Sequence, residues 1–178
     1  MIRHHDGMST YHRMYCPGGT FFFTVNLAER GSHLLLEHID ALRVAYGDVV
    51  AEHPLRTEEI VVMPDHLHAV WTLPEGDSDF STRWKKIKTR FSKSVVRGGN
   101  NGGLAPTLRA SASKRAKGEV GLWQRRFWEH TIRDEADFAA HVAYCHFNPV
   151  KHGFVERAED WPYSSVHREI RAGRWEYR

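Results

Sequence analysis

Two apolar runs joined by a short proline–aspartate connection constrain the fold of this chain more than any other feature of its sequence. The runs cover Glu58–Met63 and His66–Leu73, and Pro64 and Asp65 lie between them. Each run has the length and the apolar content of a strand. Because so short a connection joins only antiparallel neighbours, the sequence predicts a β-hairpin and therefore an antiparallel sheet.

Further strands and helices are expected on either side of this hairpin. The predicted strands are Thr20–Leu27 and Trp123–Ile132, and the predicted helices run from an N-cap at Ser32 to Glu52, from Asp79 onward, from Asp134 to Asn148, and near Ser165–Ala172. The helix after Asp134 is expected to end at Asn148 because Pro149 cannot continue it. The order strand, helix, strand, strand, helix, strand, then a helix, is that of the split βαβ, ferredoxin-like fold. We therefore predict an α+β domain with an antiparallel sheet and helices on one side.

The length of the chain limits the number of domains, and its cysteine content indicates the cellular compartment. A chain of 178 residues fits one domain, and we expect a loose N-terminal segment over 1–12, the domain over 13–153 and a tail over 154–178. A glycine-rich basic loop over 97–121 is expected inside the domain. No apolar run is long enough to span a membrane, and the N-terminus lacks the apolar stretch of a signal peptide. The two lone cysteines suit a reducing compartment, so we expect a cytoplasmic protein.

The cations are concentrated in one stretch of the chain. Between Ser81 and Arg126, 13 Lys and Arg residues stand against Glu119 alone, a charge of +12 in a chain whose net charge is only +3. Aromatic residues are interleaved with these cations, which suits unstacked bases beside phosphates. The candidate DNA-binding residues are Arg83, Lys85, Lys86, Lys88, Arg90, Lys93, Arg125 and Arg126. The alternative is a solvated basic helix followed by a basic loop.

The second strand of the hairpin begins with the pattern His66-Leu67-His68. Side chains alternate along a strand, so both imidazoles are expected on one face and Leu67 on the other. That geometry suits two ligands of one divalent metal ion. Because the chain holds 13 histidines, the pattern also arises by chance, and two histidines on a solvent-facing side are the alternative.

The helix after Asp134 carries a second set of polar side chains. At 100° per residue, Asp137, His141, Tyr144 and Asn148 fall on one stripe of that helix. Tyr144 and Asn148 are i, i+4 neighbours, so their phenol and amide are expected to project together. An amide oxygen can complete a metal site that two histidines begin, and the phenol beside it can act as a nucleophile. The alternative for Tyr144 is a packed ring with a solvated hydroxyl.

Several blocks of the sequence resemble a known family. The blocks are Tyr11–Leu27, V-V-M-P-D-H-L-H (Val61 to His68), W-Q-R-R-F-W-E-H (Trp123 to His130), Y-C-H-F-N-P-V-K-H-G (Tyr144 to Gly153) and D-W-P-Y-S-S (Asp160 to Ser165). In this order they are similar to those of REP-associated tyrosine transposases, which belong to the single-tyrosine HUH endonuclease superfamily. The resemblance implies cleavage and rejoining of single-stranded DNA at repetitive extragenic palindromes (REP), which are imperfect hairpins with a short flank.

The resemblance also implies roles for individual residues. His66, His68 and Asn148 are expected to hold Mg²⁺ or Mn²⁺, and Mn²⁺ suits imidazole nitrogen better. Tyr144 is expected to attack the phosphorus and form a 5′-phosphotyrosine. An ordinary phenol, with a pKa of about 10, is a weak nucleophile, so His141 or Lys151 is expected to assist. The expected partners are DNA hairpins, bound by a monomer or homodimer.

Two other functions are compatible with these residues. One is a catalytically silent protein that binds DNA hairpins, although such a protein would have no chemical need for the His66, His68, Tyr144 and Asn148 set. The other is a zinc-dependent hydrolase whose third ligand is His130 or His146. No H-E-x-x-H or paired-cysteine motif supports that hydrolase.

Overall fold

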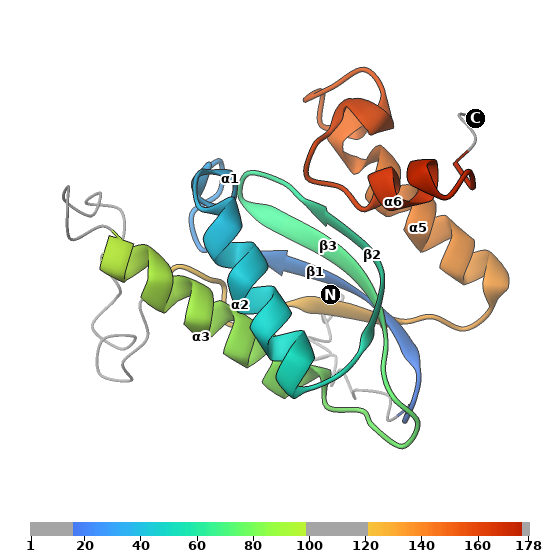
Figure 1. Ribbon diagram of the computed structural model, residues 1–178, viewed down its shortest axis with the longest axis horizontal. Coiled ribbons are helices and arrows are strands. Elements are labelled where there is room, and N and C mark those ends of the chain that lie inside the picture. Colours follow the sequence, from blue (N-terminus) through green and yellow to red (C-terminus); the bar gives the residue numbers. More distant parts are fainter. Residues whose placement is uncertain (1–15, 99–120, 176–178) are drawn as a thin grey trace, which may run out of the picture.

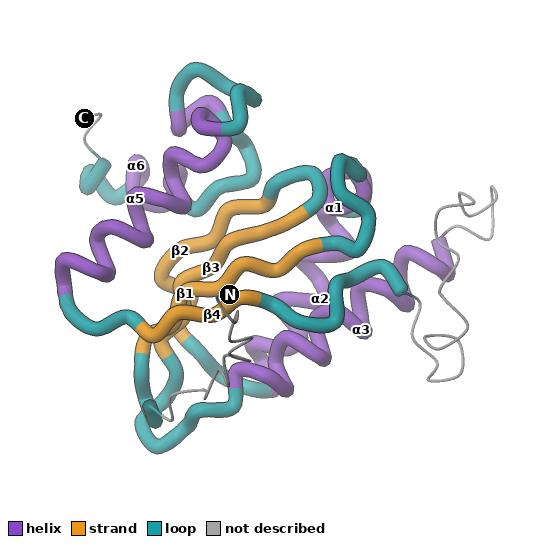
Figure 2. The backbone as a smooth tube through the Cα atoms, turned by 180° about the vertical axis from the view of Figure 1, so that it is seen from behind, coloured by secondary structure: helices purple, strands orange, loops and turns teal. Residues whose placement is uncertain are grey.

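The computed structural model describes residues 16–98 and 121–175, which contain one four-stranded antiparallel sheet (Figures 1 and 2). The strands are β1 (Thr20–Asn26), β2 (Arg56–Val62), β3 (His66–Thr72) and β4 (Trp128–Thr131), and their order across the sheet is β2-β3-β1-β4. Strand β3 therefore lies between β1 and β2, which confirms the split βαβ arrangement. The predicted segment 1–12 and most of the predicted loop 97–121 lie outside the described residues.

Helices cover both faces of the sheet. They are α1 (Leu34–Glu37), α2 (Ile39–Glu52), α3 (Phe80–Gly98), α5 (Glu135–Lys151) and α6 (Val166–Arg171), with a short 3₁₀ helix, η3 (Ala158–Asp160). In Figure 2, α2 and α3 lie behind the strands, as expected for helices on one side. Helix α5 departs from that expectation, because its Cys145 packs on the opposite face with Phe22 and Val70. The sequence order alone does not show which face a helix following the last strand will cover.

The phenylalanines of strand β1 are buried on both faces because helices cover both. Phe21, Phe23 and Val25 enter the larger core beneath α2 and α3, whereas Phe22 enters the smaller core beneath α5. The larger core also holds the stacked indoles of Trp71 and Trp84, whose ring centroids are 4.1 Å apart. The period-2 alternation of β1 thus supplies one core with three side chains and the other core with one.

Two element boundaries differ from the sequence prediction. The helix predicted after Ser32 breaks at His38, because the first turn is held against the β2–β3 connection by a hydrogen bond from the Leu35 amide to the Pro64 carbonyl (3.1 Å). Strand β4 is shorter than predicted, and Trp123 forms only an isolated bridge with Leu27. Both differences depend on contacts between distant parts of the chain, which local patterns do not report.

The predicted end of α5 at Asn148 is also wrong. The helix passes through Pro149 and continues to Lys151. A proline in the last turn removes only one backbone hydrogen bond, and the amide of His152, three residues after it, still donates to the Asn148 carbonyl (3.0 Å). Gly153, with φ of +71°, then ends the helix in a left-handed conformation.

The segment after α5 lies along the outer edge of β2. Ser164 forms a bridge with Val61, the Ser165 amide donates to the Ile60 carbonyl (2.8 Å), and the Trp161 indole donates to the Val62 carbonyl (3.0 Å). These bonds occupy backbone groups that an edge strand would otherwise expose. Within the described ranges, no helix combines the length and the apolar character needed to cross a bilayer.

Candidate active site

The β-hairpin places two imidazoles on one face of the sheet. His66 and His68 project toward α5 with ring centroids 5.0 Å apart, while Leu67 enters the core on the other face. Both histidines are buried, with 6% and 3% of their surface exposed. The predicted geometry of this pair is therefore confirmed.

Helix α5 brings Tyr144 and Asn148 to the same place. The ring of Tyr144 stands edge-on to the ring of His68, with centroids 5.1 Å apart, and 40% of the Tyr144 surface is exposed. Asn148, one turn later, is 1% exposed and lies beside the imidazole of His68. The site thus combines an accessible phenol with three buried polar side chains.

Polar atoms at the centre of this group have no hydrogen-bond partner among the described residues. They are Nε2 of His68 and both side-chain polar atoms of Asn148. Leaving such atoms buried and unpaired is costly. A divalent cation bound to Nε2 of His68 and Oδ1 of Asn148 would remove much of that cost, so these residues fit a metal ion.

The protonation state of the two histidines also favours binding of a metal ion. Burial, followed by the charge of His66, lowers the pKa of His68 to about 3, so its imidazole is neutral at physiological pH. Burial also lowers the pKa of His66. Neutral imidazole is the form that binds a metal.

Each histidine is oriented through its Nδ1 atom. Nδ1 of His66 donates to the Asp65 carboxylate (2.6 Å), and Nδ1 of His68 lies 2.9 Å from the hydroxyl of Thr24, its cross-strand neighbour. Burial by itself would raise the pKa of Asp65, but hydrogen bonds from His66 and from the Gly31 amide hold it below its ordinary value. Because a carboxylate can only accept, the lone pair of the His66 ring lies on Nε2, as in many metal sites. The His68 ring takes the same form when the Thr24 hydroxyl accepts from its Nδ1.

Sequence reasoning missed His152. This residue caps α5 and its ring lies 5.4 Å from that of His66. Its spacing of four from Asn148 was the available signal, but the helix was predicted to end before it. Lys151, predicted as an auxiliary residue, holds its ammonium 5.3 Å from the Tyr144 ring centroid.

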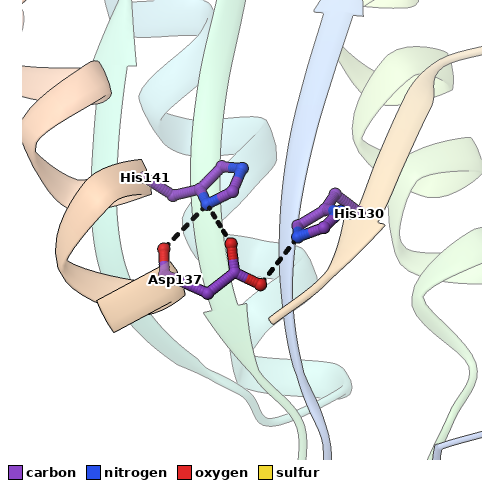
Figure 3. Close-up of side chains that lie close together, drawn as sticks. All are labelled: His130, Asp137 and His141. Atoms are coloured by element: carbon purple, nitrogen blue, oxygen red, sulfur yellow. Dashed lines mark hydrogen bonds and ion pairs between the residues drawn. The ribbon is translucent and has the colours of Figure 1, made fainter. Parts of the chain in front are cut away.

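A second polar group adjoins the site. Figure 3 shows the carboxylate of Asp137 between His130 and His141, and their ligand atoms lie within 4.8 Å of one another. The carboxylate already accepts bonds from His130 Nε2 (2.8 Å) and Arg133 Nε (3.1 Å), while His141 Nδ1 donates to the Asp137 carbonyl (2.8 Å). These bonds satisfy the group without a metal, so it fits a cation less well than His66, His68 and Asn148 do. His146, the other candidate zinc ligand, faces Glu59 instead (3.0 Å).

Three of the predicted DNA-binding cations are engaged within the protein. Arg83 is 3% exposed, donates to the carbonyls of His53 and Pro54, and pairs with Asp77 (2.7 Å), so its assignment to a phosphate-binding surface is wrong. Lys86 and Arg90 pair with Glu52 of α2, at 3.3 and 2.5 Å.

The remaining predicted cations lie on α3 and in the segment before β4. Lys85, Lys93, Arg125 and Arg126 are exposed. Lys88 is half-buried, with its ammonium over the rings of Trp123 (5.8 Å) and Phe127 (5.4 Å). Their contact with DNA stays a prediction.

Comparison with known proteins finds relatives that match most of the chain. No family model matches it. It is 43% identical over 166 residues to the REP-associated tyrosine transposase of Escherichia coli (strain K12), covering 93% of this chain and 87% of the relative. It is 39% identical to a putative REP-associated tyrosine transposase of Haemophilus influenzae, covering 93% of this chain and 89% of that protein.

A solved structure gives the same result. The fold matches a REP-associated tyrosine transposase bound to a REP hairpin, with a TM-score of 0.77 and 43% identity. The match covers 95% of this chain and 89% of the other. From the extent and identity of these matches, the chain belongs to the REP-associated tyrosine transposase family.

Proposed function

We propose that this protein is a metal-dependent transposase that cleaves and rejoins single-stranded DNA at REP-type hairpins through Tyr144. The observation that carries the proposal is the Tyr144 ring edge-on to His68, 5.1 Å between centroids, beside polar atoms that lack partners. An accessible nucleophile next to a set of metal ligands is the arrangement that phosphoryl transfer requires.

The metal ligands in this proposal are His66, His68 and Asn148. Mn²⁺ or Mg²⁺ held there would act as a Lewis acid on the phosphate oxygens. The Asp65 carboxylate holds His66 in the tautomer that ligates, and the Thr24 hydroxyl holds the ring of His68 in place. His152 lies close enough to His66 to influence access to the site.

Tyr144 supplies the covalent chemistry. Its hydroxyl oxygen bonds to phosphorus, the bond from phosphorus to the 3′ oxygen breaks, and that oxygen leaves as a 3′-hydroxyl after taking up a proton. The phenolic proton passes to a base or to water. Attack by a second 3′-hydroxyl on the phosphotyrosine then reverses these steps and rejoins a strand without ATP.

Lys151 is the auxiliary residue that the contacts favour. Its ammonium lies 5.3 Å from the Tyr144 ring, where a positive charge stabilises the phenolate during attack. His141 is one turn before Tyr144, and its Nδ1 is bonded to Asp137, which leaves Nε2 to accept a proton. No contact between His141 and Tyr144 favours it over Lys151.

The proposed partner is a DNA hairpin, because the solved relative is bound to one. Trp128, on β4, is 53% exposed and lies edge-on to Phe22, which also contacts Tyr144. An exposed indole at that position offers a stacking surface for an unpaired base entering the site.

Covalent trapping tests the proposal directly. A 3′-labelled oligonucleotide with a REP-type hairpin and its flank is incubated with protein and Mn²⁺, then separated on a denaturing gel. Wild type should give a slow-moving protein–DNA adduct, and Tyr144→Phe should give neither adduct nor cut DNA while it still binds the hairpin. Tyr163→Phe is the matched control and should form the adduct.

Two outcomes would overturn the proposal. If Tyr144→Phe cuts DNA normally, water is the nucleophile and the protein is a hydrolytic nuclease. If wild type binds hairpins but forms no adduct with any divalent metal, the protein is a silent hairpin binder.

A further inference from the structure

His152 lies at the edge of the proposed metal site, one helical turn beyond Asn148. Because the two residues are four apart on α5 and its C-cap, their side chains are neighbours on one face of the helix. The amide of His152 donates to the Asn148 carbonyl (3.0 Å), which fixes the residue at the end of the helix. The stripe of α5 that carries Tyr144 and Asn148 therefore continues to an imidazole.

The ring of His152 lies beside the imidazoles of the hairpin. Its centroid is 5.4 Å from that of His66, close to the 5.0 Å that separates His66 from His68. Burial is the largest cause of the lowered pKa of both His66 and His68, and the charge of His152 contributes to each. Three imidazoles, two from β3 and one from the end of α5, thus form a single group.

The ring nitrogens of His152 are accessible to a metal ion. The residue is exposed, and no group of residues 16–98 or 121–175 forms a hydrogen bond with its side chain. Phe154 stacks on the ring, with centroids 6.2 Å apart and planes at 28°, and itself packs against Trp161 (5.4 Å). An apolar contact therefore helps to position the imidazole and takes up neither of its nitrogens.

The proposed ligand set lacks an anionic member. His66, His68 and Asn148 are all neutral when they bind a metal ion, so the affinity depends on how many of them there are. Three protein ligands would leave three positions open on a six-coordinate ion, the coordination that Mg²⁺ and Mn²⁺ adopt. A fourth neutral ligand would raise the affinity and still leave two positions for phosphate oxygens.

We propose that His152 is the fourth protein ligand of the metal ion, an inference that rests on the proposed function. A third imidazole makes the ligand set rich in nitrogen. Such a set favours Mn²⁺ over Mg²⁺, because Mg²⁺ prefers oxygen ligands and gives up its water reluctantly. His152 thereby contributes to the choice of metal as well as to its affinity.

Calorimetric titration with Mn²⁺ and with Mg²⁺, without DNA, tests this assignment apart from catalysis. His152→Ala should lower the Mn²⁺ affinity by roughly tenfold or more, and the loss for Mg²⁺ should be smaller. His152→Asn offers an amide oxygen in place of the imidazole nitrogen. It should keep more of the Mn²⁺ affinity than alanine does, and its preference for Mn²⁺ over Mg²⁺ should be weaker than that of wild type.

Pulsed electron paramagnetic resonance of the Mn²⁺-loaded protein counts the nitrogen ligands directly. Wild type should show couplings from three imidazoles, and His152→Ala from two, a change that a purely structural role would not produce. His33→Ala removes an exposed imidazole from the N-cap of α1 and is the matched control, with unchanged affinities and couplings expected. The melting temperature of each metal-free variant shows that it is folded.

The possible results separate this assignment from the proposed function. Unchanged Mn²⁺ affinity in a folded His152→Ala protein, or equal nitrogen couplings in that variant and in wild type, would overturn the fourth ligand. If His68→Ala then loses Mn²⁺ and wild type still forms the adduct on Tyr144, only this assignment fails. If wild type binds Mn²⁺ through three imidazoles but never forms the adduct, the cleavage mechanism fails and the fourth ligand stands.

Discussion

Replacing Asp65 by asparagine tests how the metal ligands are oriented. The Asp65 carboxylate lies between β2 and β3, where one oxygen accepts from Nδ1 of His66 (2.6 Å) and the other from the Gly31 amide (2.7 Å). It therefore fixes the proton of His66 on Nδ1 and leaves Nε2 for the metal. Asparagine keeps the shape of the side chain but removes the charge that favours this tautomer.

The expected loss follows from the role of such partners in other metal sites. Removing the hydrogen-bond partner of a metal-binding histidine costs roughly 10–100-fold in metal affinity or activity, which corresponds to about 1.4–2.8 kcal/mol. The Gly31 bond also becomes weaker, which should destabilise the fold by about 1 kcal/mol and lower the melting temperature by roughly 2–4 °C in a chain of this size.

Calorimetric titration with Mn²⁺ measures the metal affinity of wild type and Asp65→Asn directly. The variant should need 10–100-fold more Mn²⁺, and saturating metal should restore much of its adduct formation. Asp40→Asn removes an exposed carboxylate from α2 and is the control. Unchanged Mn²⁺ affinity in a folded Asp65→Asn protein would show that Asp65 does not orient a ligand, and would also weaken the assignment of His66.

Three further predictions concern the metal, the surface charge and the thiols. His68→Ala, or EDTA added to wild type, should abolish the adduct while hairpin affinity stays within about twofold, since the phosphate contacts persist; full activity in EDTA would exclude the metal site. The double variant Lys85→Ala, Lys93→Ala should flatten the dependence of log affinity on log salt by about 0.7 per lost phosphate contact, and an unchanged slope would place the DNA elsewhere. Cys145, which is fully buried and whose pKa burial raises, should resist iodoacetamide in the native protein, whereas half-buried Cys16 should react; labelling detected by mass spectrometry at Cys145 would show that α5 opens.

The part of the site that depends on local periodicity could be predicted from the sequence. His66 and His68 share a face because side chains alternate along any strand. Tyr144 and Asn148 project together because i and i+4 are neighbours on any helix. Neither statement requires knowledge of the rest of the fold.

The position of His152 could not be predicted in this way. A proline normally ends a helix, so the helix was predicted to end at Asn148. Tertiary packing keeps Pro149 within α5, and the added turn carries His152 to within 5.4 Å of the His66 ring. The error in one helix boundary thus concealed a neighbour of the proposed metal ligands.

Charge counting was similarly incomplete, because it does not include partners distant in the sequence. Glu52 ends α2 and forms ion pairs with Lys86 and Arg90 of α3, which follow it by more than thirty residues. Arg83 is enclosed by the carbonyls of His53 and Pro54. The exposed basic surface is therefore smaller than the net charge of the segment suggests.

Phe22 lies at the centre of the polar groups of this site. It is the one residue of its phenylalanine triplet that faces α5, and it is 2% exposed. Its ring lies 5.5 Å from His68, 5.7 Å from Tyr144 and 4.7 Å from His141. One apolar side chain thus lies between the proposed metal ligands and the Asp137 group and contacts both. Because β1 alternates, the same triplet that builds the large core beneath α2 and α3 also sets the spacing of the chemical groups on the opposite face.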